Sequence, residues 1–257
     1  MGKSLINKNY TKYLIREILF TIAILFSSGS FIQTFMLTKG IDSHLVAIYP
    51  SVIQIVQTAA IFLCSLVCDR IRKIKRITTV ISFIMPIIFV GFLISELPGI
   101  IDNTAYIIIL IASIIANVAL GFYNVIVYRF PYHIIEMADY GKLCSISGMI
   151  SSVLSISLTS LISFLVNYFD FFVIMLITFT LGIVLWVLSA IVCHLLKEKK
   201  LEETVEKDLK KEHFNIIKYP YFYRLIPANI LRGIGVGIIT QIVLIGIQVG
   251  ILDTNLS

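Results

Sequence analysis

The stretch from residue 171 to residue 195 reads FFVIMLITFTLGIVLWVLSAIVCHL and contains no Asp, Glu, Lys or Arg. A helix of that length covers about 37 Å at about 1.5 Å per residue, and the hydrocarbon core of a bilayer is about 30 Å thick. Because unpaired backbone N–H and C=O groups are costly in lipid, such a stretch is predicted to cross the membrane as a helix. The fold class that follows is an all-α integral membrane protein.

Apolar runs of similar length recur along the 257-residue chain. Pro50 and Pro86 lie inside two of them, and we expect bends there, not breaks, because neighbouring helices can satisfy the freed carbonyl groups. Apolar residues make up 58% of the chain and charged residues 14%, more apolar surface than a soluble domain of this length can bury. The predicted spans are 18–37, 45–68, 77–95, 105–128, 144–166, 171–195 and 228–252.

The basic residues lie almost all on one side of the predicted membrane. Of the 21 Lys and Arg residues, all but Lys39 and Arg232 fall in the N-terminal segment or in connections on the same side. Arg16 is counted there as a flanking charge before the first span. Because Lys and Arg collect in cytoplasmic loops, the N-terminus is predicted to be cytoplasmic, in a protein of the plasma membrane. The charges form no basic face with interleaved aromatic residues, so nucleic acid is not expected as a partner.

The chain divides into three parts by composition. Residues 1–196 hold six spans with short connections and are predicted to form an N-terminal six-helix transmembrane bundle. Residues 197–224 form a charged cytoplasmic linker, in which alternating charges at i,i+4 spacing predict a surface helix. Residues 225–257 hold the seventh span, which we expect to begin a second, incomplete bundle.

The connection between the second and third spans carries a recognisable motif. Residues 65–76 read SLVCDRIRKIKR, which resembles the G-x-L-A-D-R-x-G-R-K loop motif of the major facilitator superfamily. Asp69, Arg70 and Lys73 match the motif, whereas Ser65 and Arg72 replace its two glycines. The family carries this motif in the cytoplasmic loop after its second helix, where the charge distribution also puts Asp69.

The resemblance implies a function and a role for this loop. Members of the family have two six-helix halves and move solutes by alternating access, with the solute site between the halves near the membrane midplane. The resemblance therefore implies a secondary active transporter of a small solute, and a loop whose charges hold one transport state. The solute, its direction and any coupling ion are not specified by the sequence.

Polar side chains inside the spans are candidates for the solute cavity, because each is costly in lipid and tends to face the bundle interior. Asn117, Gly121, Asn124 and Tyr128 share one face of the fourth span at helical spacing. For each amide, a hydrogen bond between helices explains the position equally well. No Asp or Glu lies in the body of a predicted span, so a coupling proton has no carboxylate carrier there. The candidate cavity residues are Gln33, Gln54, Asn117, Asn124, Tyr128 and Gln241.

Arg232, near the start of the seventh span, is the candidate intramembrane charge. Snorkelling of its side chain to the cytoplasmic surface fits its position better than a place in the solute path.

Two other classes of membrane protein stay open. A seven-helix receptor is disfavoured by the cytoplasmic N-terminus and the long connection after the sixth span. An intramembrane enzyme is disfavoured because H-E-x-x-H, G-x-S-x-G and P-loop motifs are absent, so we expect no catalytic residues and no cofactor. Cys64 and Cys68 lack nearby partners for a metal site, so no metal is expected. The expected partners are the lipid bilayer and a small solute, and a coupling ion stays open.

Overall fold

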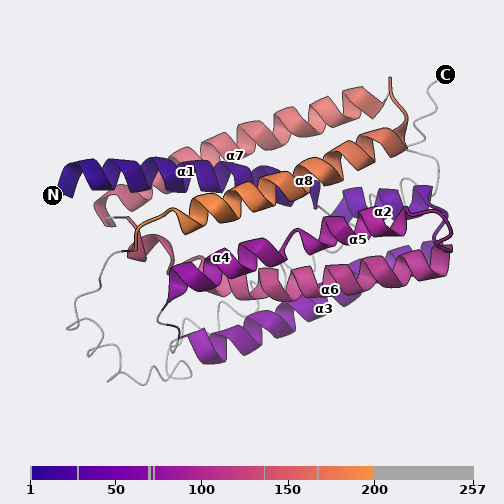
Figure 1. Ribbon diagram of the computed structural model, residues 1–257, viewed down its shortest axis with the longest axis horizontal. Coiled ribbons are helices and arrows are strands. Elements are labelled where there is room, and N and C mark those ends of the chain that lie inside the picture. The colour runs from indigo at the N-terminus through magenta and orange to yellow at the C-terminus, as the bar shows by residue number, and fades with distance from the viewer. Residues whose placement is uncertain are drawn as a thin grey trace, which may run out of the picture. The chain divides into compact units, whose positions relative to one another are not determined.

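The computed structural model describes residues 2–27, 29–68, 71, 73–135, 137–166 and 168–198. All regular structure in these residues is helical, and they contain no strand. Figure 1 shows the helices lying side by side along one common direction. The helices are α1 (Gly2–Phe26), α2 (Gly29–Thr38), α3 (Ser43–Val67), α4 (Ile74–Ile84), α5 (Ile87–Ser95), α6 (Asp102–Ile126), the 3-10 turn η2 (Pro131–His133), α7 (Met137–Val166) and α8 (Phe171–His194).

Six stretches of these helices are long and apolar enough to span a membrane, which confirms the all-α class and indicates an integral membrane protein. They correspond to the first six predicted spans, but the first begins at Asn9 instead of residue 18. The linker beyond Glu198 and the predicted span 228–252 lie outside the described residues. The six stretches are Asn9–Thr38, Ser43–Val67, Ile74–Ser95, Asp102–Ile126, Asp139–Ile162 and Phe171–His194.

The two prolines inside spans have different effects. Pro50 lies within α3, which continues through it as one helix, as predicted. Pro86 separates α4 from α5, so the expected bend is an interruption of the helix. Pro86 has no N–H to donate, and after it the Ile88 N–H donates to the Met85 carbonyl oxygen at 3.4 Å and the Phe89 N–H to the Pro86 carbonyl oxygen at 3.0 Å.

The helices pack in a defined order. α1 lies against α7 and α8, α8 lies against α4 and α5, and α6 lies against α3, α4 and α5. In the interior, the Phe179 ring contacts Phe35 at 5.2 Å and Phe92 at 4.7 Å between ring centroids. On the outside, Ile55 and Ile156 are 69% and 70% exposed. Such outward apolar side chains fit a bundle whose surroundings are hydrocarbon.

Gly121 sets the distance between α3 and α6. A Cβ atom at this position would lie 2.6 Å from the Ala60 Cβ and 2.8 Å from the Gln57 carbonyl oxygen. The second of these contacts is with backbone, which cannot move aside without shifting the helix. The absence of a side chain is therefore what lets the two backbones approach.

We predict that Gly121→Ala lowers the free energy of unfolding by about 1 to 3 kcal/mol, because the added methyl group forces α3 away from α6. Gly148→Ala is the matched control, since no heavy atom lies within 4 Å of a Cβ built at Gly148 in α7. The control should be as stable as the wild type, or more stable by up to about 1 kcal/mol from helix propensity. Thermal unfolding in detergent measures both variants, and equal stability of the two would contradict the close contact.

Candidate functional site

Arg16 is the largest charged side chain buried inside the described bundle. It lies on α1, seven residues after the start of the span Asn9–Thr38, which is about 10 Å along the helix axis. Its side chain is 0% exposed. The sequence analysis counted Arg16 as a flanking charge before the first span, and the structure shows that this side chain is covered by the protein instead of exposed. The apolar and aromatic surroundings contributed by α6 and α8 cover this turn of α1, which the hydropathy of α1 alone did not indicate.

One nitrogen of the Arg16 guanidinium makes all of the side-chain hydrogen bonds seen at this residue. Nη1 donates to the Tyr123 hydroxyl oxygen on α6 at 2.7 Å and to the carboxylate of the neighbouring Glu17. The guanidinium carbon also lies over the rings of Phe20 at 4.6 Å, Tyr123 at 5.0 Å and Phe130 at 5.7 Å. These aromatic faces favour a cation and partly replace the hydration that burial removes.

The remaining guanidinium nitrogens, Nε and Nη2, have no hydrogen-bond partner in the described part of the chain. The indole Nε1 of Trp186 on α8 is likewise buried and unpaired there. Both side chains contact Phe20, whose ring lies edge-on to Trp186 at a centroid distance of 5.1 Å. Buried N–H groups in folded proteins are nearly always paired, so this centre is equipped to receive acceptor atoms.

Contacts between helices hold the Arg16 turn of α1 in place. The Asn9 amide and the Lys12 ammonium donate to the carbonyl oxygens of Lys197 and Leu195, at 2.9 and 3.2 Å, just beyond the end of α8. Lysine and amide donors at a helix C-terminus satisfy carbonyl groups that lack partners within the helix. The N-terminal half of α1 is thereby fixed against α8.

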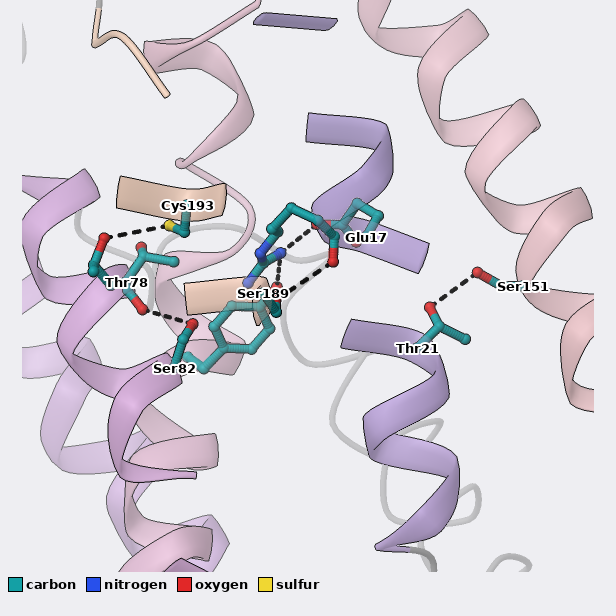
Figure 2. A network of polar contacts seen from close by, with 10 residues as sticks. Glu17, Thr21, Thr78, Ser82, Ser151, Ser189 and Cys193 are labelled. Carbon is teal, nitrogen blue, oxygen red and sulfur yellow. Dashed lines mark hydrogen bonds and ion pairs between the residues drawn. The ribbon is translucent and has the colours of Figure 1, made fainter. Parts of the chain in front are cut away.

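Figure 2 shows two further polar ties beside this turn. The hydroxyl groups of Thr21 on α1 and Ser151 on α7 lie 3.0 Å apart, within hydrogen-bond distance. The Ser189 hydroxyl on α8 makes a long hydrogen bond of 3.5 Å to the carbonyl oxygen of Arg16. α1 is therefore tied by hydrogen bonds to both of its neighbours, α7 and α8.

Glu17 opens onto a cavity of about 160 Å³ between α1, α7 and the segment after α6. Its side chain is 17% exposed, so the carboxylate links buried Arg16 with this space. The sequence analysis found no Asp or Glu in the body of a predicted span, and Glu17 lies just before the predicted first span 18–37 but within the longer helical stretch Asn9–Thr38. The other lining residues are Tyr13, Val127, Tyr128, Pro131, Tyr140, Leu143, Cys144 and Ser147.

A second cavity, of about 380 Å³, lies where α2 and α5 end and α8 begins. It is lined by Phe35 and Lys39, among others, and by Glu96 and Asp170. Here the charged groups already have partners. Lys39 Nζ lies 2.8 Å from the Glu96 carboxylate, and the Asp170 carboxylate accepts from the Phe172 N–H at the start of α8. This second cavity therefore lacks the unpaired donors found around Arg16.

The structure places the predicted cavity residues in different surroundings. Tyr128 lines the cavity beside Glu17 and is 72% exposed. Gln33 is 3% exposed, and its Nε2 has no hydrogen-bond partner among the described residues. Gln54 is exposed on α3. Asn117 and Asn124 are half-buried on α6, on either side of Gly121, which packs tightly against α3. The Asn117 amide donates to the Ser113 carbonyl oxygen in its own helix.

Most of the predicted loop motif cannot be placed. Asp69 and Arg70 lie outside the described residues, as do Gln241 and Arg232, while Lys73 is exposed just before α4. Beside the motif, the Arg129 guanidinium donates to the carbonyl oxygen of Cys68 at 2.7 Å, which ties the segment after α6 to the end of α3.

Arg16 and Glu17 are the site residues that the sequence analysis missed. The signal that could have found them is the apolar and aromatic content of the preceding turn, where Tyr13, Leu14 and Ile15 extend the apolar run before the charged pair. The described residues contain no group of three His, Cys, Asp or Glu side chains suited to a metal ion.

In comparisons with family models, curated proteins and solved structures, nothing matches this chain. The resemblance to the major facilitator superfamily therefore stays a hypothesis that rests on the loop motif and the order of the spans.

We predict that Tyr123→Phe lowers the free energy of unfolding by about 1.5 to 3 kcal/mol, because it removes the neutral acceptor of a buried charged donor and keeps the ring. Tyr128→Phe is the control, since that side chain is 72% exposed and should tolerate the change. Thermal unfolding of both variants in detergent tests the prediction. A Tyr123→Phe variant as stable as the control would show that the hydroxyl does not support Arg16.

Proposed function

We propose that this chain is a secondary active transporter of a small solute, of major facilitator type, and that Arg16 and Glu17 belong to its solute pathway. The observation that carries the proposal is the fully buried guanidinium with two unpaired nitrogens. A charge inside a membrane bundle is costly and generally marks an ion or substrate path. An ion pair kept only for stability would be expected to have its remaining N–H groups satisfied.

The arrangement of the bundle supports the same proposal. The two cavities lie at different ends of the spans, one beside Glu17 and one beside Lys39. Between them Phe20 of α1 packs against Trp186 of α8, and Phe179 of α8 packs against Phe89 of α5. The linings of the two cavities share no residue. Alternating access requires such a closed middle that opens toward one end at a time.

Topology and motif add to the support. In this proposal the N-terminus and the end of the bundle that holds Arg16 face the cytoplasm, in agreement with the distribution of Lys and Arg along the sequence. The motif that includes Asp69, Arg70 and Lys73 would follow the second span on the same side. A receptor would bind its ligand without moving it across the membrane, so a transport assay separates the two functions.

The full chain should be reconstituted in vesicles, supplied with a mixture of small metabolites, and analysed by mass spectrometry for solutes that accumulate inside. We expect saturable uptake of at least one solute by the wild type. Glu17→Gln should reduce its rate about tenfold or more, because the partner of the buried charge is lost. The control Lys142→Gln changes a charge at an exposed position of α7 and should leave the rate unchanged. Equal accumulation in empty vesicles would refute the proposal.

A further inference from the structure

We infer that the unpaired edge of the Arg16 guanidinium binds an oxyanion, so that the solute carries a carboxylate or phosphate group. This inference rests on the proposed function, because it assigns a chemical class of solute to the same centre. Its starting point is which nitrogens are free. Nη1 is occupied by Tyr123 and Glu17, whereas Nε and Nη2 have no partner in the described residues.

Nε and Nη2 lie on the same edge of the planar guanidinium group. Their N–H bonds point in parallel, which is the geometry that takes two oxygens of one carboxylate or phosphate group. The occupied nitrogen, Nη1, belongs to the other edge. The pattern at Arg16 therefore leaves one complete bidentate edge open.

The surroundings of this edge favour acceptor atoms over donors. The unpaired buried atoms around Phe20 are Nε and Nη2 of Arg16 and Nε1 of Trp186, and all three are hydrogen-bond donors. A cationic ligand would be repelled by the guanidinium. A neutral carbonyl group offers one oxygen, whereas an oxyanion offers two in one plane together with a negative charge.

Glu17 explains how an anion could be accommodated beside a pair that is already neutral. Arg16 and Glu17 form an ion pair in the present structure, so an added oxyanion would leave one excess negative charge in the interior. Glu17 also lines the cavity of about 160 Å³. Its carboxylate can therefore turn from Nη1 of Arg16 toward this space, where hydration costs less than burial, and the charge of the guanidinium is then balanced by the oxyanion on the Nε and Nη2 edge.

Trp186 provides the test, because it is the only tryptophan of the chain. The purified full chain is titrated with acetate, succinate and inorganic phosphate, and the fluorescence of Trp186 is recorded. Acetamide serves as the neutral counterpart of acetate, and sodium chloride controls for ionic strength. We expect a saturable change with a carboxylate, with phosphate or with both, and the separate titrations show which of the two groups the site prefers.

Two variants test whether the fluorescence change of Trp186 comes from binding at Arg16. Arg16→Lys keeps the positive charge but has no bidentate edge, and it should raise the half-saturating concentration at least about tenfold. Arg129→Lys, at the hydrogen bond to Cys68, is the matched control and should leave the concentration unchanged. If Arg16→Lys fails to fold, the melting temperature of the wild type is measured with and without each ligand in place of the titration of the variant. The oxyanion should raise this temperature and acetamide should not.

Three results would overturn the inference: no saturable change with any oxyanion, the same change with acetamide, or full binding by a folded Arg16→Lys variant. Ordered water alone on Nε and Nη2 would produce the first of these. Uptake of a neutral or cationic solute that depends on Glu17 would overturn the oxyanion inference and leave the transport proposal standing. If oxyanion binding depends on Arg16 but no solute crosses the vesicle membrane, the inference is supported and the transport proposal is refuted.

Discussion

A guanidinium group that is fully buried must have its charge and its N–H groups compensated before helices can close around it. Arg16 obtains this compensation from three directions: the Glu17 carboxylate, the Tyr123 hydroxyl and a set of aromatic faces. These partners come from α1, α6 and the segment after α6. The Trp186 ring of α8 packs edge-on against Phe20, which itself contacts Arg16. One charged side chain therefore joins α1 to α6 and to the segment after α6 at this end of the bundle.

The rest of the bundle follows a different rule. Away from Arg16, helices approach through the absence of side chains, as at Gly121 between α3 and α6, or through stacked rings such as Phe92 and Phe179. These contacts are made by apolar atoms and backbone, although the buried amide of Gln33 on α2 also has an unpaired nitrogen among the described residues. The Arg16 centre differs because the guanidinium carries a charge and, although it is buried, the N–H groups on one of its edges have no hydrogen-bond partner in the described residues. That difference is why we connect the function with Arg16 and not with the tightly packed remainder.

The sequence predicted the fold better than the site, for a physical reason. Backbone hydrogen bonding in lipid forces any long apolar run into a helix, so the six described spans follow from local composition. Burial of a charged residue depends on which other helices cover it, and Arg16 looks like a flanking charge until α6 and α8 are in place. Gly121 shares the face of the fourth span that was predicted to line the cavity, but a missing side chain also allows close packing, and here it faces Ala60. Tyr128 was predicted from helical spacing and lines the cavity beside Glu17.

The most direct test of a functional charge at this centre replaces Arg16 and Glu17 together by neutral side chains of similar size, in the double variant Arg16→Met, Glu17→Gln. Replacing both members of a buried ion pair is often neutral or stabilising, whereas removing one leaves an uncompensated charge. Thermal unfolding and solute uptake are measured on the same reconstituted sample. Our account predicts an unfolding temperature at least as high as that of the wild type, with saturable uptake abolished. A double variant that still transports at the wild-type rate would contradict the account, and so would one that loses both its fold and its uptake.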